Sequence, residues 1–165
     1  METNHFFEDT SCTSDPHKAR IHLLVSRLQL EAALLHSGLR IWVASDHVTY
    51  WTNPYFGRIT LFCNSSNRIG FLCCLLVGEI IETEELRTFI KSNNCEIKPF
   101  ELELSEQSNG LLILMRATFL ETFDPQAIVQ ALRRAVEIAN SIEPTLREEL
   151  FLTPFKSSNS TILSK

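Results

Sequence analysis

The chain has 165 residues, 44% of them hydrophobic, which is enough for one domain with a filled core. Fifteen basic and 20 acidic residues give a formal net charge of −5, which argues against a nucleic-acid partner because phosphates need a basic surface. The acidic start has no signal-peptide pattern, and the longest apolar run, Ile69–Val77, is far shorter than the roughly 20 residues that span a bilayer. We therefore expect a cytoplasmic protein with no membrane partner.

Residues 1–15 are expected to form a flexible tail, because they are polar and unpatterned. Asp15-Pro16 combines an N-cap residue with a proline at the first helical position, so it predicts a helix start. The helix is expected to end at Ser37-Gly38. Its apolar stripe is wider than one face, which indicates contact on two sides, with the core and with a partner. The stripe consists of Ile21, Leu23, Leu24, Val25, Leu28, Leu30, Ala32, Leu34 and Leu35.

Extended segments follow, separated by turn residues, at Leu39–Ala44, His47–Thr52 and Arg58–Cys63. Arg68–Val77 is almost wholly apolar, which predicts a central strand that is covered on both faces. Gly78 is expected to break this strand.

A short helix is predicted to open at Glu82–Glu85, where acidic residues suit the positive end of the helix dipole, and to end at Asn94. Apolar and acidic residues alternate over Phe100–Leu104, a pattern typical of a half-exposed strand. The chain then turns over Ser105–Gly110 and returns as an apolar strand over Leu111–Leu120.

Asp124-Pro125 repeats the N-cap-and-proline start, and another apolar stripe at helical spacing follows it. Pro144 is expected to interrupt this last helix, and residues 153–165 are expected to form a flexible, serine-rich tail. The order α-βββ-α-ββ-α predicts a single α+β domain over residues 16–152, with helices packed around an antiparallel sheet.

No motif in the chain is typical of catalysis, so we expect no catalytic residue, no cofactor and no metal. The histidines and cysteines lack zinc-like spacing, and neither a phosphate-binding loop nor a Gly-x-Ser-x-Gly elbow is present. The vicinal pair Cys73–Cys74 resembles a thiol switch, but a strand sends these two side chains to opposite faces. A cysteine-dependent enzyme, the third of our functional hypotheses, would need Cys63 or Cys95 beside His47.

Aromatic side chains gather in a short stretch of the chain and have two interpretations. They either pack against the first helix or form a partner-binding patch, because aromatic residues are enriched in interface hot spots. If their strands form a sheet edge, an extended peptide could add to it through main-chain hydrogen bonds. The residues are Trp42, Tyr50, Trp51, Tyr55 and Phe56.

Over roughly Lys18–Leu150 the element order resembles the class I type III secretion chaperones and the related YbjN family. The stretches that carry this resemblance are Asp46–Trp51, Arg68–Gly78, Pro99–Leu104, Gly110–Ala117, Phe123–Ile128 and Val136–Asn140. The bulky cluster of Trp42, Trp51 and Tyr55 and the very apolar run Ile69–Val77 depart from the family pattern.

The resemblance implies a non-catalytic homodimer that holds a protein client, an effector's N-terminal segment, in extended form without ATP. It also implies pairing through the second helix and neighbouring strands, which points to Leu86, Phe89, Ile90 and Phe100. The alternative is a stand-alone regulatory or scaffold protein of the YbjN type that binds folded partners.

Overall fold

The computed structural model describes residues 15–52, 54–105, 110–116 and 122–154. This part of the chain contains helices packed against one antiparallel sheet, which confirms the predicted α+β class. Four strands precede the second helix and a short strand follows the third, so the order is α-ββββ-α-ββ-α-β.

The helices begin where the capping residues predict. Asp15 accepts a hydrogen bond from the backbone N–H of His17 at 3.0 Å, and Asp124 accepts one from Gln126 at 2.9 Å. The middle helix is capped by Thr83. The three helices are α1 (Pro16–His36), α2 (Glu84–Glu96) and α3 (Pro125–Glu149).

The described strands form a single sheet in the order β1-β2-β3-β4-β6-β5, and β7 pairs with the end of β4. The edge strands of this path are therefore β1 and β5. The strands are β1 (Arg40–Val43), β2 (His47–Trp51), β3 (Phe56–Cys63), β4 (Ile69–Glu79), β5 (Phe100–Ser105), β6 (Gly110–Arg116) and β7 (Thr153–Pro154).

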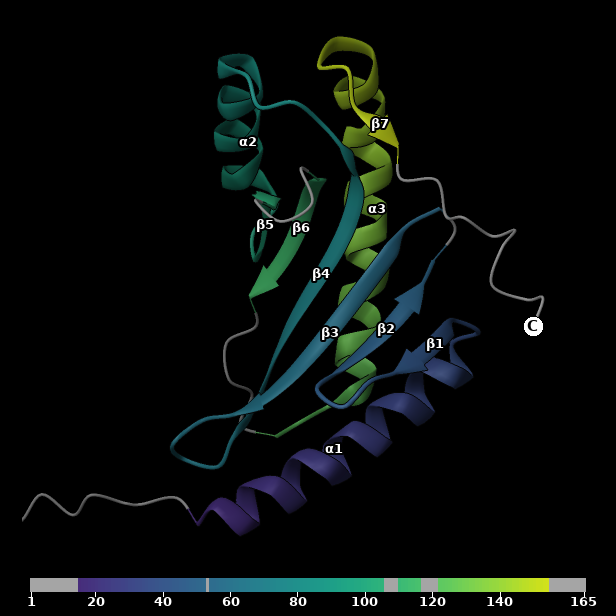
Figure 1. Cartoon of the computed structure of the whole chain (residues 1–165), viewed down its shortest axis with the longest axis vertical. Helices are drawn as coiled ribbons and strands as arrows, with labels where there is room; N and C mark the ends of the chain where they lie inside the picture. The colour runs from purple at the N-terminus through teal and green to yellow at the C-terminus, as the bar shows by residue number, and fades with distance from the viewer. Residues whose placement is uncertain (1–14, 53, 106–109, 117–121, 155–165) are drawn as a thin grey trace, which may run out of the picture.

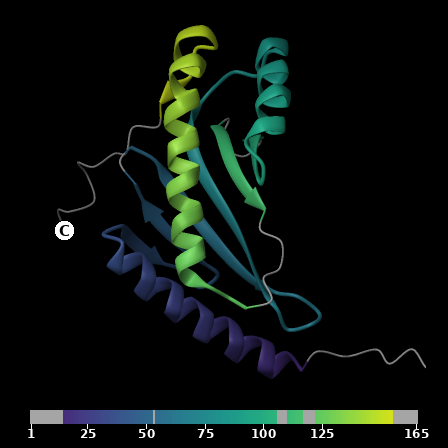
Figure 2. The same cartoon turned by 180° about the vertical axis from the view of Figure 1, so that it is seen from behind.

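Helices α1 and α3 lie on the same face of the sheet, behind it in Figure 1 and in front of it in Figure 2. The core fills the space between these helices and the sheet. As predicted, β4 lies in the middle of the sheet, but no described helix covers the central part of its other face, so the second cover that the apolar pattern predicts is not found among the described residues. Along β4 the side chains alternate accordingly: Cys73 and Leu75 are buried, whereas Cys74 and Leu76 are only half-buried.

Gly78 was expected to break β4, but the strand continues to Glu79 through a bulge between Leu76 and Gly78. A β-carbon at Gly78 would lie 2.5 Å from the carbonyl oxygen of Thr153, so glycine is what allows β7 to pair there. Thr153 and Pro154, expected to open the tail, therefore belong to the sheet. The predicted tails over residues 1–14 and 155–165 lie outside the described residues.

Pro144 does not interrupt α3, which continues through it to Glu149. Proline removes one backbone hydrogen bond from a helix, here to the carbonyl of Asn140, but both Asn140 and Pro144 are exposed to water. Leu146, two residues later, is fully buried and holds the last turn of the helix against the core.

Candidate protein-binding surfaces

The sheet face opposite α1 and α3 carries a group of apolar side chains, which we call the open face. Trp51, Phe56 and Leu76 lie side by side on it, because they occupy one cross-strand row of β2, β3 and β4. The rings of Trp51 and Phe56 meet edge to face, with centroids 5.5 Å apart. Trp42, on the edge strand, is 62% exposed. The open face comprises Trp42, Trp51, Phe56, Phe62, Leu72 and Leu76.

Two of the five aromatic residues predicted to bind a partner lie in the core instead. Tyr50 is fully buried on the helix side of the sheet, where its hydroxyl lies 3.2 Å from the Cys73 sulfur. The hydroxyl of Tyr55 donates to the Glu143 carboxylate of α3 at 2.7 Å and to Asn140 at 3.0 Å. Burial raises the pKa of both phenols above their ordinary value. The predicted patch is thus divided between the core and the open face.

The two edges of the sheet differ in how their backbone groups are used. The N–H of Ala44 donates to the His47 carbonyl at 2.9 Å, so the backbone groups of Ala44 point toward β2. In an antiparallel pair, residues alternate between pointing toward the neighbouring strand and pointing away from it. The backbone groups of Ile41 and Val43 therefore point away from β2. These groups lie along the outer edge of β1. The tip of the β1–β2 hairpin is held to α1 by Arg27, which donates to the carbonyls of Ala44 and Ser45.

The β5 edge is occupied by the side chain of one α2 residue. Asn94 donates to the Leu102 carbonyl at 3.1 Å and accepts from the Leu102 N–H at 2.7 Å. Asn94 was expected to end its helix, but α2 continues to Glu96, which keeps this amide directed at β5. The neighbouring N–H of Phe100 donates to Ile97, so this stretch of the edge is closed to another strand.

Helix α1 has a second apolar surface on the side away from the core, which we call the α1 stripe. Its core side buries Leu30, Ala33 and Leu34, which confirms one of the two contacts that the wide apolar pattern predicts. The opposite side leaves large aliphatic side chains 46–62% exposed. The α1 stripe consists of Ile21, Leu24, Val25, Leu28 and Leu35.

The residues predicted for a dimer interface lie at the α2–β5 side of the fold. Leu86 and Phe100 are buried within the chain, at 0% and 4% exposure, so their side chains have almost no area left for a second subunit. Phe89 and Ile90 are half-buried, and Ile90 lines a shallow hollow of about 520 Å³ between α2 and β5.

The structure does not bring the cysteines proposed for catalysis to His47. His47 pairs with Thr60 and so faces the open side, whereas Cys63, three residues further along β3, faces the other side. Cys95 lies on α2, which packs against β5, and three strands (β3, β4 and β6) separate β5 from the β2 strand of His47. Burial raises the pKa of Cys73 to about 12, so its thiol is protonated and unreactive at neutral pH.

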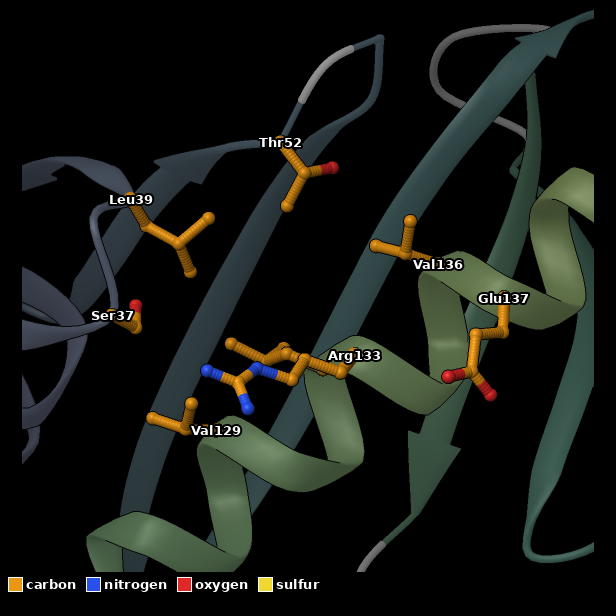
Figure 3. Close-up of a pocket in the computed structure, with 8 residues that line it drawn as sticks. Ser37, Leu39, Thr52, Val129, Arg133, Val136 and Glu137 are labelled. Atoms are coloured by element: carbon orange, nitrogen blue, oxygen red, sulfur yellow. The ribbon is translucent and has the colours of Figure 1, made fainter.

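A pocket of about 320 Å³ opens between the C-terminal end of α1, the end of β2 and α3 (Figure 3). In this view Arg133 reaches toward Ser37, while the rest of the wall is largely aliphatic. The Ser37 hydroxyl already donates to the Leu34 carbonyl at 2.6 Å, and that of Thr52 donates to Tyr55. The two hydroxyls that line this pocket are therefore already engaged, and its charged groups are Arg133 and Glu137, of which Glu137 pairs with Arg134.

No protein-family model, curated protein or solved structure matches the chain. Among the described helices, none is long and apolar enough to cross a membrane. Within the same residues, no three histidine, cysteine or acidic side chains are grouped so that they could hold a metal ion.

Proposed function

We propose that this protein is a non-catalytic, cytoplasmic protein-binding module that holds an extended client segment on the open face, as a homodimer resembling the class I type III secretion chaperones. The observation that carries this proposal is the open face itself. It is a sheet surface with two tryptophans and two phenylalanines and no described helix over its centre. Aromatic side chains of this kind provide most of the energy at protein interfaces.

An extended client suits this surface because β1, which adjoins it, is an edge strand of the sheet. The outward backbone groups of Ile41 and Val43 can pair with an added strand, and Trp42 projects from the same edge onto the open face. Main-chain pairing would give affinity for any extended segment. The aromatic side chains would then select alternate apolar residues of the client, since these point to one face of a strand.

Both tryptophans of the chain, Trp42 and Trp51, belong to the open face, so intrinsic fluorescence reports on it directly. The probe is reduced, carboxamidomethylated ribonuclease A, an unfolded basic chain without tryptophan. We expect a saturable blue shift of the emission, because the client displaces water from the indole rings. Native ribonuclease A serves as the folded control and is expected to give no shift.

Matched variants test whether the open face is responsible for binding. Trp42→Ala is expected to weaken binding of the unfolded probe about tenfold, because it removes a hot-spot-type side chain. Ile81→Ala is the control, since Ile81 is 84% exposed outside the open face. Equal affinities of Trp42→Ala and the wild type would contradict the proposal. Tighter binding of the native ribonuclease would favour the folded-partner alternative of the YbjN type.

A further inference from the structure

The α1 stripe has the spacing of a helix-pairing seam. Ile21, Leu28 and Leu35 follow one another at intervals of seven residues, and Leu24 lies between the first two. All four are more than half exposed, on the side of α1 opposite to its buried residues. A continuous aliphatic surface of this kind on a soluble chain indicates an interface.

The arrangement of side chains along the stripe is symmetric about its centre. Ile21 and Leu35 lie at equal distances on either side of Leu28, and so do Leu24 and the exposed Ala32. In an antiparallel pair of identical helices centred on Leu28, each Ile21 would therefore meet a Leu35, and each large Leu24 would meet a small Ala32. A two-fold axis requires such self-complementarity.

The charges of α1 favour the same orientation. Lys18 and Arg20 lie in its first turns, and its last turn carries His36 and no acidic residue. An antiparallel pair places these two cations beside the partner's helix C-terminus, the negative end of the helix dipole. A parallel pair would instead bring the four cations of two copies together at the positive ends of both helix dipoles, with the N-cap carboxylates of Asp15 as the acidic groups beside them.

We propose that two copies of this chain associate through their α1 stripes, with the helices antiparallel and the two-fold axis at Leu28. The inference rests on the homodimer part of the proposed function and assigns it a surface. This surface is separate from the open face, which lies on the other side of the sheet, and from the α2–β5 side that carries Phe89 and Ile90.

Sedimentation equilibrium of the full chain tests the association. We expect the wild type at twice the chain mass of 18.9 kDa and Leu28→Glu at the single mass, because two carboxylates would meet at the axis. Ile81→Glu is the matched control and is expected to remain dimeric. Circular dichroism checks the fold of each variant, and Leu28 is 57% exposed, so its replacement leaves the core intact.

Disulfide mapping by mass spectrometry tests the orientation. Leu28→Cys is expected to crosslink to a second Leu28→Cys chain, and an Ile21→Cys chain to a Leu35→Cys chain. Ile21→Cys alone is expected not to self-link, because equivalent residues would be about 21 Å apart along the antiparallel helices. Efficient self-linking of Ile21→Cys would overturn the antiparallel arrangement.

Three other results would overturn the inference: a monomeric wild type, a dimeric Leu28→Glu, or a Leu28→Cys thiol that links to Cys12 within its own chain. The last result would mean that the N-terminal segment occupies the stripe. The ribonuclease titration of Leu28→Glu separates this inference from the proposed function. If Leu28→Glu binds the unfolded ribonuclease with the wild-type affinity per chain, the proposed protein binding stands even where the proposed dimer surface is wrong.

Discussion

The α-carbon of Gly57 lies directly against the ring of Tyr50. The two residues are cross-strand partners of β3 and β2, and a β-carbon at Gly57 would lie 2.2 Å from Cζ of the tyrosine. The ring thus occupies the space of the missing side chain. This places the tyrosine hydroxyl beside Cys73 and completes the packing of the sheet against the helices.

We expect Gly57→Ala to lower the free energy of unfolding by about 2–3 kcal/mol, because the methyl group overlaps the Tyr50 ring. Chemical denaturation measures this loss. Gly38→Ala is the control: Gly38 has a positive φ but nothing within 4 Å, so only backbone strain of about 1 kcal/mol is expected. Adding Tyr50→Leu to Gly57→Ala removes the overlapping ring and should restore part of the lost free energy of unfolding. If it restores none, the overlap with the ring does not cause the loss.

Arg27→Ala is expected to destabilise the protein by about 2 kcal/mol, because the guanidinium donates to two carbonyls at the tip of the β1–β2 hairpin. The rate of amide hydrogen exchange near Ala44 should be higher in Arg27→Ala than in the wild type. Arg134→Ala provides the comparison, since the ion pair of Arg134 with Glu137 is exposed and contributes about 0.5 kcal/mol or less. Equal losses in the two variants would argue against the anchoring role.

Asn94→Ala is expected to expose the backbone of Leu102, so the rate of hydrogen exchange at the Leu102 N–H should increase. The free energy of unfolding should fall by about 1–3 kcal/mol, because the backbone groups lose their partner. Asn93→Ala is a close control, because the side-chain hydrogen bond of Asn93 stays within its own helix, where the amide donates to the Phe89 carbonyl. An unchanged exchange rate at Leu102 in Asn94→Ala would show that the amide does not protect this edge.

The stability of the protein is expected to fall at alkaline pH, in part because burial raises the pKa of Cys73 from 9.0 to about 12. Between these values the unfolded thiol loses its proton and the folded thiol keeps it, so unfolding becomes easier as the pH rises, by up to about 1.4 kcal/mol per pH unit. Denaturation series from pH 8 to 11 measure this slope. It should be shallower in Cys73→Ala but not in Cys95→Ala, whose thiol is exposed.

Features decided by neighbouring residues could be predicted from the sequence. The caps at Asp15 and Asp124 depend only on the following turn, and the alternation over Phe100–Leu104 fixes which side chains face the core. The same alternation could have separated Tyr50 from Trp51, since adjacent strand residues face opposite sides. The five aromatic residues therefore divide between the two faces of the sheet and do not form one patch.

Features decided by distant parts of the chain could not be predicted. Both sides of α1 are apolar, so the pattern gives no indication of which side packs on the sheet. The apolar character of both faces of β4 likewise does not reveal that only one face receives helices. Pro144 is tolerated because Leu146 is buried beyond it, and that burial depends on tertiary packing.

The closure of the β5 edge by Asn94 limits the kinds of assembly that the fold can form. A chain whose two edges were both open could join head to tail, β1 of one copy to β5 of the next, and such heterologous contacts propagate without end into a fibre. With the Phe100–Leu102 stretch closed, this route to polymerisation is blocked. In the described part of the sheet, strand addition is thereby confined to the β1 edge, because the Phe100–Leu102 stretch of β5 no longer offers free backbone groups.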